Sequence, residues 1–150
     1  MRRLFLTALA IMSALGLDAQ IKSVRMQDTK AEKYGPVFFE IALTGNWDNP
    51  YLQEEAALDM LLTSPSGKEL CLPCFYISGN SGEESTWEAR FTPQEVGNYT
   101  YRFIYKEKGQ NTSESPVQVL KVKKSGKQGI LHLRDNWTLQ YDNGDIYRGI

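Results

Sequence analysis

Short runs of alternating apolar and polar residues recur along the chain, with turn-forming residues between them. In the clearest run, residues 87–91, an apolar side chain stands at every second position. This period of two is typical of a half-buried strand. Pro93 and Gly97 then bracket a turn. Aromatic residues alternate after it, at Tyr99, Tyr101, Phe103 and Tyr105. The two runs predict a pair of strands.

The turn between these strands has the sequence of a tyrosine corner. In such a corner, the hydroxyl of a Tyr near the start of a strand bonds to backbone a few residues upstream. Tyr99 stands in the right place for this role. Immunoglobulins carry a cysteine two residues later, and here Tyr101 occupies that position. The segment predicts a sandwich and offers no catalytic group.

Other strands are predicted around Val24 and Met26 and over residues 36–43, 69–72, 75–77 and 117–122. Residues 53–64 are ambiguous, because their intrinsic propensity also suits a helix. The short turn at 64–68 leads directly into the next strand, which favours a hairpin. We therefore predict that Ala56, Leu58, Met60 and Leu62 share one face of a strand.

About seven strands over some 100 residues match the size of an immunoglobulin-like sandwich. The sequence predicts an all-β, immunoglobulin-like β-sandwich at residues 20–124 and a linker at 125–129. Residues 130–150 follow as a separate β-hairpin, in which Asn143-Gly144 is a strong turn signal.

The N-terminus has the order of a secretory signal peptide, expected at residues 1–19. Arg2 and Arg3 precede an apolar stretch, and Ala19 is the expected cleavage position. The stretch is too short for a typical spanning helix. We expect an exported protein without a membrane span, and the family resemblance described below implies the periplasm or the exterior of a bacterium.

The net charge of −1 gives no general attraction to nucleic acid, and no nucleic-acid partner is expected. Four lysines near the predicted linker are interpreted as solvated residues: Lys121, Lys123, Lys124 and Lys127.

The two cysteines, Cys71 and Cys74, have the CxxC spacing of redox sites. A thioredoxin-type site lies at the start of a helix, whereas this pair lies in predicted strand. A local disulfide and two packed thiols both remain open. A zinc site would need further ligands, and the only histidine is the distant His132. No metal and no cofactor are expected.

No catalytic motif is present. The paired acids at 54–55 and 83–84 are adjacent on strand or loop, so they do not form the facing carboxylates of a glycosidase. Aromatic side chains in loops can stack on sugars, and the candidates are Trp47, Tyr51 and Tyr76. Aromatic residues of a sandwich are more often part of its core.

Several motifs together resemble a known family, the family 5060 domain of unknown function, an N-terminal module of secreted bacterial glycoside hydrolases. The residues that carry the resemblance are Trp87, Arg90, Phe91, Pro93, Gly97, Tyr99 and Tyr101. Further matches lie at 49–51, 64–68 and 73–76, so the resemblance covers roughly residues 22–124. One departure is Cys74, where relatives usually have glycine.

The resemblance implies a non-catalytic accessory module that packs against a glycosidase barrel or positions its substrate. Residues 130–150 are similar to the start of such a barrel, which suggests a truncated or missing catalytic domain. In longer relatives the partner is the catalytic domain, and polysaccharide is a further expected partner. The alternatives are a free-standing carbohydrate-binding module and a thiol oxidoreductase that uses Cys71 and Cys74.

Overall fold

The structure, a computed structural model, describes residues 19–28 and 30–148. Its regular elements in these residues are all strands. Their bounds are β1 Gln20–Met26, β2 Ala31–Glu32, β3 Val37–Thr44, β4 Ala56–Thr63, β5 Glu69–Pro73, β6 Phe75–Ser78, β7 Glu84–Phe91, β8 Gly97–Glu107, β9 Gln110–Glu114, β10 Gln118–Lys123, β11 Leu131–Leu133 and β12 Leu139–Tyr141. The expected signal peptide lies outside the described residues, except for Ala19. No helix in the described part is long and apolar enough to cross a membrane.

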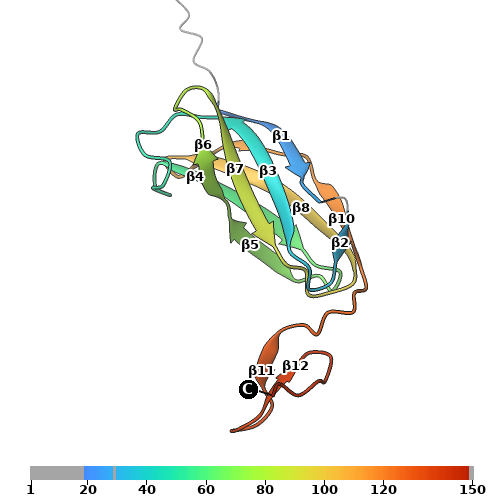
Figure 1. The fold of residues 1–150 in the computed structure, drawn as a ribbon. Coiled ribbons are helices and arrows are strands. Elements are labelled where there is room, and N and C mark those ends of the chain that lie inside the picture. Colours follow the sequence, from blue (N-terminus) through green and yellow to red (C-terminus); the bar gives the residue numbers. More distant parts are fainter. Residues whose placement is uncertain (1–18, 29, 149–150) are drawn as a thin grey trace, which may run out of the picture.

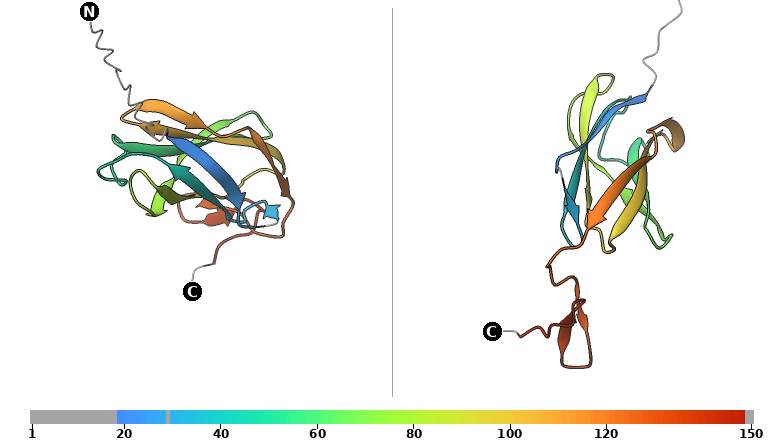
Figure 2. Two further views of the ribbon diagram at one scale, coloured as in Figure 1. Left: turned by 90° about the horizontal axis from the view of Figure 1, so that it is seen from above. Right: turned by 90° about the vertical axis from the view of Figure 1, so that its right-hand side faces the viewer.

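Ten of the described strands form two facing sheets, as Figure 1 and the right-hand view of Figure 2 show. The smaller sheet has the order β1-β3-β7-β6. The larger has the order β2-β10-β8-β4-β5, and β9 pairs with the far end of β8. All pairs are antiparallel except the short β2–β10 pair. The predicted all-β sandwich is therefore confirmed.

The strand order corresponds to that of immunoglobulin domains, which place strands ABED in one sheet and GFC in the other. Here β1, β3, β7 and β6 take the first set, and β10, β8 and β4 take the second. The sequence predicts about seven strands. The additional ones in the described residues include the two-residue β2 and the partly exposed β9, which are too short or too polar to give an alternation signal.

The core lies between the sheets, because each long strand turns every second side chain inward. Strands β3 and β4 alternate buried and half-buried residues along their whole length. The ambiguous segment 53–64 thus contains a strand, and the predicted inner face of Ala56, Leu58, Met60 and Leu62 is confirmed. The segment is a strand despite its helix propensity because β4 pairs with β5 on one side and with β8 on the other.

The tyrosine corner forms as predicted. The hydroxyl oxygen of buried Tyr99 accepts hydrogen bonds from the backbone N–H groups of Gln94, at 3.2 Å, and Glu95, at 2.9 Å. Tyr101, two residues later, packs against Phe39 of β3 with ring centroids 5.0 Å apart. In immunoglobulins a disulfide joins the corresponding strands B and F. An aromatic pair therefore occupies the place of that bond.

The strand predicted over residues 117–122 is present as β10, and its apolar residues lie on different faces. Val117 and Val119 are exposed, whereas Leu120 and Val122 are buried. Val117 and Val119 are two positions apart, so their side chains lie on the same, outward face. The valine spacing alone indicates a strand but does not show which face is covered.

Residues 131–148 form a small separate unit beyond the sandwich (Figure 2). Its two-stranded sheet pairs β11 with β12. The segments 138–141 and 146–147, on either side of Asn143-Gly144, meet in one isolated bridge, Gln140–Ile146. The turn signal at Asn143-Gly144 marks a real turn, in which Gly144 N–H donates to Tyr141 O. The longer pairing of β12 is with the segment that precedes it.

Candidate functional site

The three proposed sugar-contact residues come together at one end of the sandwich. Tyr76 of β6 is their centre, with ring centroids 6.2 Å from Trp47 and 5.5 Å from Tyr51. Trp87 of β7 lies beneath them, 5.6 Å from Tyr76 and 6.1 Å from Trp47. The sequence indicates this cluster because Trp47 and Tyr51 lie in a predicted loop and Tyr76 lies in a short predicted strand.

The loop that carries Trp47 and Tyr51 is held by several hydrogen bonds. One carboxylate oxygen of Glu55 accepts from the N–H groups of Asp48 and Asn49, at 2.8 and 2.9 Å. Trp47 N–H donates to the hydroxyl of Ser81 in the neighbouring loop, at 2.8 Å. The backbone of the loop is therefore fixed at Trp47 and at the two residues that follow it.

The exposure of the three rings differs greatly. Tyr51 is 73% exposed, whereas Trp47 is only 8% exposed and Tyr76 is half-buried. The Tyr51 and Tyr76 rings meet nearly at right angles, at 86°. A flat platform of three parallel rings is not formed by these residues. The arrangement can offer one tyrosine face, supported from below by the edge of a second ring.

The two cysteines lie where the chain passes from one sheet to the other. Cys71 is in β5 of the larger sheet, and Cys74 is the single residue between β5 and β6. Both are free thiols here. Cys71 is exposed, whereas Cys74 is half-buried and packs against the core. The local disulfide and the pair of packed thiols stay alternative predictions.

The surroundings of Cys74 do not favour a reactive thiolate. Burial raises the pKa of its thiol far above the usual value, and the negative charges of Asp59 and Cys71 act in the same direction. A redox nucleophile requires the opposite shift, toward a lower pKa. Cys74 therefore lacks the electrostatics of a redox nucleophile.

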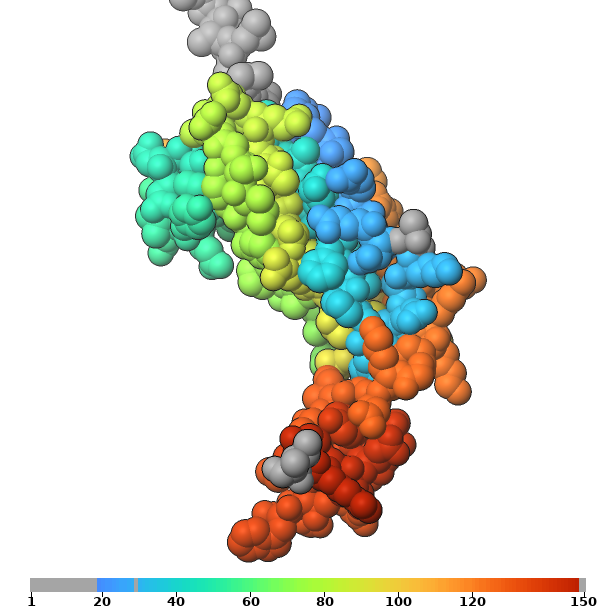
Figure 3. Space-filling view, viewed as in Figure 1, coloured from blue at the N-terminus to red at the C-terminus, as the bar shows by residue number. Residues whose placement is uncertain are grey.

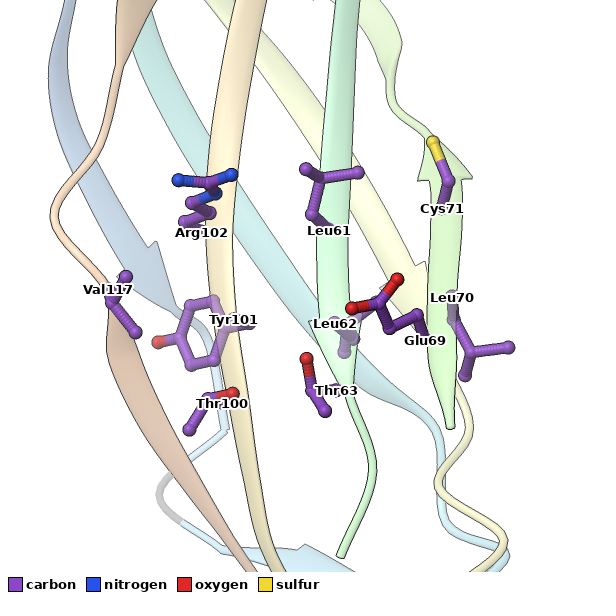
Figure 4. A pocket seen from close by; sticks show the side chains of 10 residues that line it. All are labelled: Leu61, Leu62, Thr63, Glu69, Leu70, Cys71, Thr100, Tyr101, Arg102 and Val117. Atoms are coloured by element: carbon purple, nitrogen blue, oxygen red, sulfur yellow. The ribbon is translucent and has the colours of Figure 1, made fainter. Parts of the chain in front are cut away.

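A shallow hollow of about 470 Å³ lies on the outer face of the larger sheet (Figure 4). Its outward side chains form two rows across the strands, because Leu61 pairs with Cys71 and Arg102 while Thr63 pairs with Glu69 and Thr100. Apart from Cys71, none of these residues is a candidate from the sequence. The sequence shows only that these positions alternate with the buried ones along each strand. Any exposed face of a sheet gives the same pattern.

The hollow holds few groups for chemistry. Glu69 is the one carboxylate that lines it. The guanidinium of Arg102 is 3.3 Å from the carboxylate of Glu114. Among the residues that the structure describes, no three His, Cys, Asp or Glu side chains are grouped so that they could hold a metal ion.

The sequence matches the family described as "Domain of unknown function (DUF5060)" over residues 30–106, which is just over half of the chain. The chain belongs to this family. The match runs from β2 through most of β8 and contains all seven motif residues, from Trp87 to Tyr101, on which the resemblance rested. It is shorter than the expected 22–124, so β1 and β10 lie outside it. No curated protein matches the chain.

Among solved structures, the chain is similar to a candidate glycoside hydrolase from Bacteroides vulgatus, with a TM-score of 0.58 and 18% identity. That likeness covers 80% of this chain and 21% of the other. A candidate β-galactosidase from Bacteroides fragilis follows at a TM-score of 0.44 and 14% identity, covering 86% of this chain and 20% of that one. An alkylpurine DNA glycosylase from Pseudomonas fluorescens has a TM-score of 0.46 and 8% identity, and the likeness covers 71% of this chain and 30% of the other. The chain thus spans about a fifth to a third of the length of these proteins.

The matched residues of the DUF5060 region support its framework. Gly97 has a φ of +135°, and a Cβ there would lie 2.9 Å from Cγ of Pro65. Phe91 packs on Tyr99 with centroids 5.2 Å apart. The carbonyl of Pro93 accepts a hydrogen bond from Tyr34 N–H at 2.8 Å.

Arg90 differs from the other matched residues because it lies outside the core. Its guanidinium is 4.8 Å from the Phe75 ring centroid and 5.7 Å from that of Phe38, and its Nε is 2.7 Å from Glu88. Arg90 therefore bridges three strands of the smaller sheet, β3, β7 and β6, on their outer face.

Proposed function

We propose that the sandwich at residues 20–124 is a non-catalytic accessory module of an exported glycoside hydrolase, which packs against a catalytic domain or positions its substrate. The observation that carries the proposal is the coverage of the Bacteroides vulgatus likeness. The fold of this chain accounts for 21% of that candidate glycoside hydrolase. The remainder of such a protein is where its catalytic groups would lie.

The chemistry of the described residues supports a non-catalytic role. Glycoside hydrolysis ordinarily needs two carboxyl groups roughly 5–10 Å apart across a substrate cleft. The hollow on the larger sheet is lined by Glu69 alone among acids. At the aromatic end, the carboxylate of Glu55 is engaged by loop N–H groups. Neither place offers an acid and a nucleophile facing one another.

The test of this proposal is a hydrolysis assay of the purified full chain. Incubated alone with a panel of plant and host glycans, it should release no reducing sugar above the buffer blank. Glu69→Gln provides a matched control, because it removes the carboxylate of the hollow and should leave the blank-level signal unchanged. Turnover by the full chain that Glu69→Gln abolishes would refute the proposal.

A second candidate, carbohydrate binding, is favoured by one observation, the high exposure of Tyr51 on a hydrogen-bonded loop. If Tyr51 stacks on sugar, Tyr51→Ala should lose polysaccharide binding in affinity electrophoresis, while Trp137→Ala should keep it. Trp137 is a suitable control because it is 95% exposed and belongs to the C-terminal unit. Equal migration of the parent chain with and without polysaccharide would eliminate this candidate.

A further inference from the structure

Tyr34 occupies a backbone position that normally takes glycine. It is the third residue of a turn closed by the hydrogen bond from Gly35 N–H to Glu32 O, at 2.9 Å. Its φ is +61°, and a positive φ at this position is the pattern of a type II turn, which selects Gly or Asn. A side chain with a Cβ is strained there. A non-glycine residue stays in this conformation only where contacts elsewhere offset the strain.

The side chain of Tyr34 points to the C-terminal unit. It lies against Gly129, where an added Cβ would be 2.8 Å from the Tyr34 ring atom Cε2 and 2.7 Å from Oδ2 of Asp142. Gly129 itself has a φ of +91°. Glycine is thus required here for two reasons: its positive φ, and the space that a Cβ would take from the Tyr34 and Asp142 side chains.

Asp142 gathers contacts from the sandwich, the connecting segment and the hairpin. Its Oδ2 accepts from Ile130 N–H at 2.8 Å, and its Oδ1 is 3.5 Å from Nδ1 of His132 in β11. The Ile130 hydrogen bond, followed by the Tyr34 hydroxyl, holds the pKa of this carboxyl below its usual value, and His132 and Lys33 act in the same direction.

The connecting segment is attached on both sides. The hydroxyl of Ser125 donates to Lys33 O at 2.5 Å on the sandwich side. On the hairpin side, Asn143 N–H donates to Gln128 O at 3.1 Å. Figure 3 shows the orange linker lying against the blue-to-cyan segment that contains residues 30–40. The predicted linker is therefore not a free tether in this structure.

We propose that Tyr34, Gly129 and Asp142 form a coupling interface that fixes the orientation of the C-terminal hairpin unit on the sandwich. Tyr34 contributes the contact surface and a hydroxyl, Gly129 the space, and Asp142 the acceptor that joins the three segments. The interface gives an accessory module a rigid connection to whatever its hairpin unit contacts. All three residues belong to this chain, and the interface involves no glycan and no catalytic domain. Its test is therefore independent of the hydrolysis assay.

The test is backbone ¹⁵N relaxation of the full chain. In the parent chain, amides of β11 and β12 should share the overall tumbling of the sandwich, with order parameters near about 0.85, the value of rigid backbone. In Tyr34→Gly and in Asp142→Ala, the hairpin amides should fall below about 0.6. The matched control is Lys108→Gly, because Lys108 also has a positive φ, +48°, but lies in the β8–β9 turn.

Thermal unfolding of the sandwich separates coupling from ordinary stabilisation. Tyr34→Gly removes backbone strain, so the sandwich midpoint should stay level or rise while the hairpin becomes mobile, and Lys108→Gly should leave the hairpin rigid. Three results would overturn the proposal: parent hairpin amides that already tumble independently, a Tyr34→Gly hairpin that stays rigid, or loss of rigidity together with a lower sandwich midpoint.

Discussion

At the residue scale, the sandwich depends on a few contacts between positions that are distant in the chain. The alternation of residues 87–91 and 99–105 is local, so the sequence predicts their buried faces and the tyrosine corner correctly. The pairing of Phe39 with Tyr101 and the contact of Gly97 with Pro65 depend on how the sheets meet. No local pattern contains that information.

Gly97 offers the sharpest residue-scale test. Gly97→Ala should lower the free energy of unfolding by about 1–3 kcal/mol, because it strains a φ of +135° and brings a methyl group to 2.9 Å from Pro65. Urea denaturation of the full chain measures the loss. Gly126→Ala is the matched control, since Gly126 has open space around it and no positive φ. Equal midpoints for the two variants would contradict the explanation.

At the scale of elements, the sequence predicts the strands better than their partners. Residues 69–72 and 75–77 are both predicted as strand, yet the switch between sheets at Cys74 is invisible in the pattern. The C-terminal turn is likewise found at Asn143-Gly144, while β12 pairs mainly with β11. Pairing is decided by tertiary packing, and short strands carry too few residues to specify a partner.

The sheet switch also predicts different reactivities for the two thiols. In the reduced, native full chain, a disulfide reagent should titrate one thiol rapidly, that of exposed Cys71, and the second only after denaturation. The reason is that burial raises the pKa of Cys74, so its thiolate is scarce. Cys71→Ser should abolish the rapid phase and Cys74→Ser should retain it. Two rapid equivalents in the parent chain would disagree with this placement.

At the scale of the whole molecule, two units of different construction are joined. The sandwich has an extensive apolar core between its sheets. The C-terminal unit is held largely by carboxylates that accept hydrogen bonds, at Asp135, Asp142 and Asp145. The sequence predicts a linker at 125–129 between the units, where lysines surround Ser125 and Gly126. It does not reveal the Tyr34 contact, because the two partners are about a hundred residues apart.

This difference predicts that acid acts on the C-terminal unit first. Hydrogen bonds lower the pKa of all three aspartates, so their stabilising contribution is complete above the ordinary value of about 3.9. It is lost as the pH falls through their lower native values. Amide signals of Ile130, Trp137 and Thr138 should therefore shift together below about pH 4.

Leu120 in the sandwich core provides the internal reference for this titration. Its amide signal should stay in place while those of the C-terminal unit move, and added salt should weaken the effect because the carboxylates are exposed. A simultaneous loss of both sets of signals would mean that the two units unfold as one.

The passage of the chain from β5 to β6 has one more consequence, for self-association. Free strand edges are templates on which other chains can pair. Because a single residue separates β5 from β6, the edge of one sheet continues directly as the edge of the other. This shared edge is interrupted by Pro73, which has no N–H to donate, and by a register shift between Tyr76 and Ser78. An almost wholly β protein thereby presents on this side a border too short and too bent to seed fibrils.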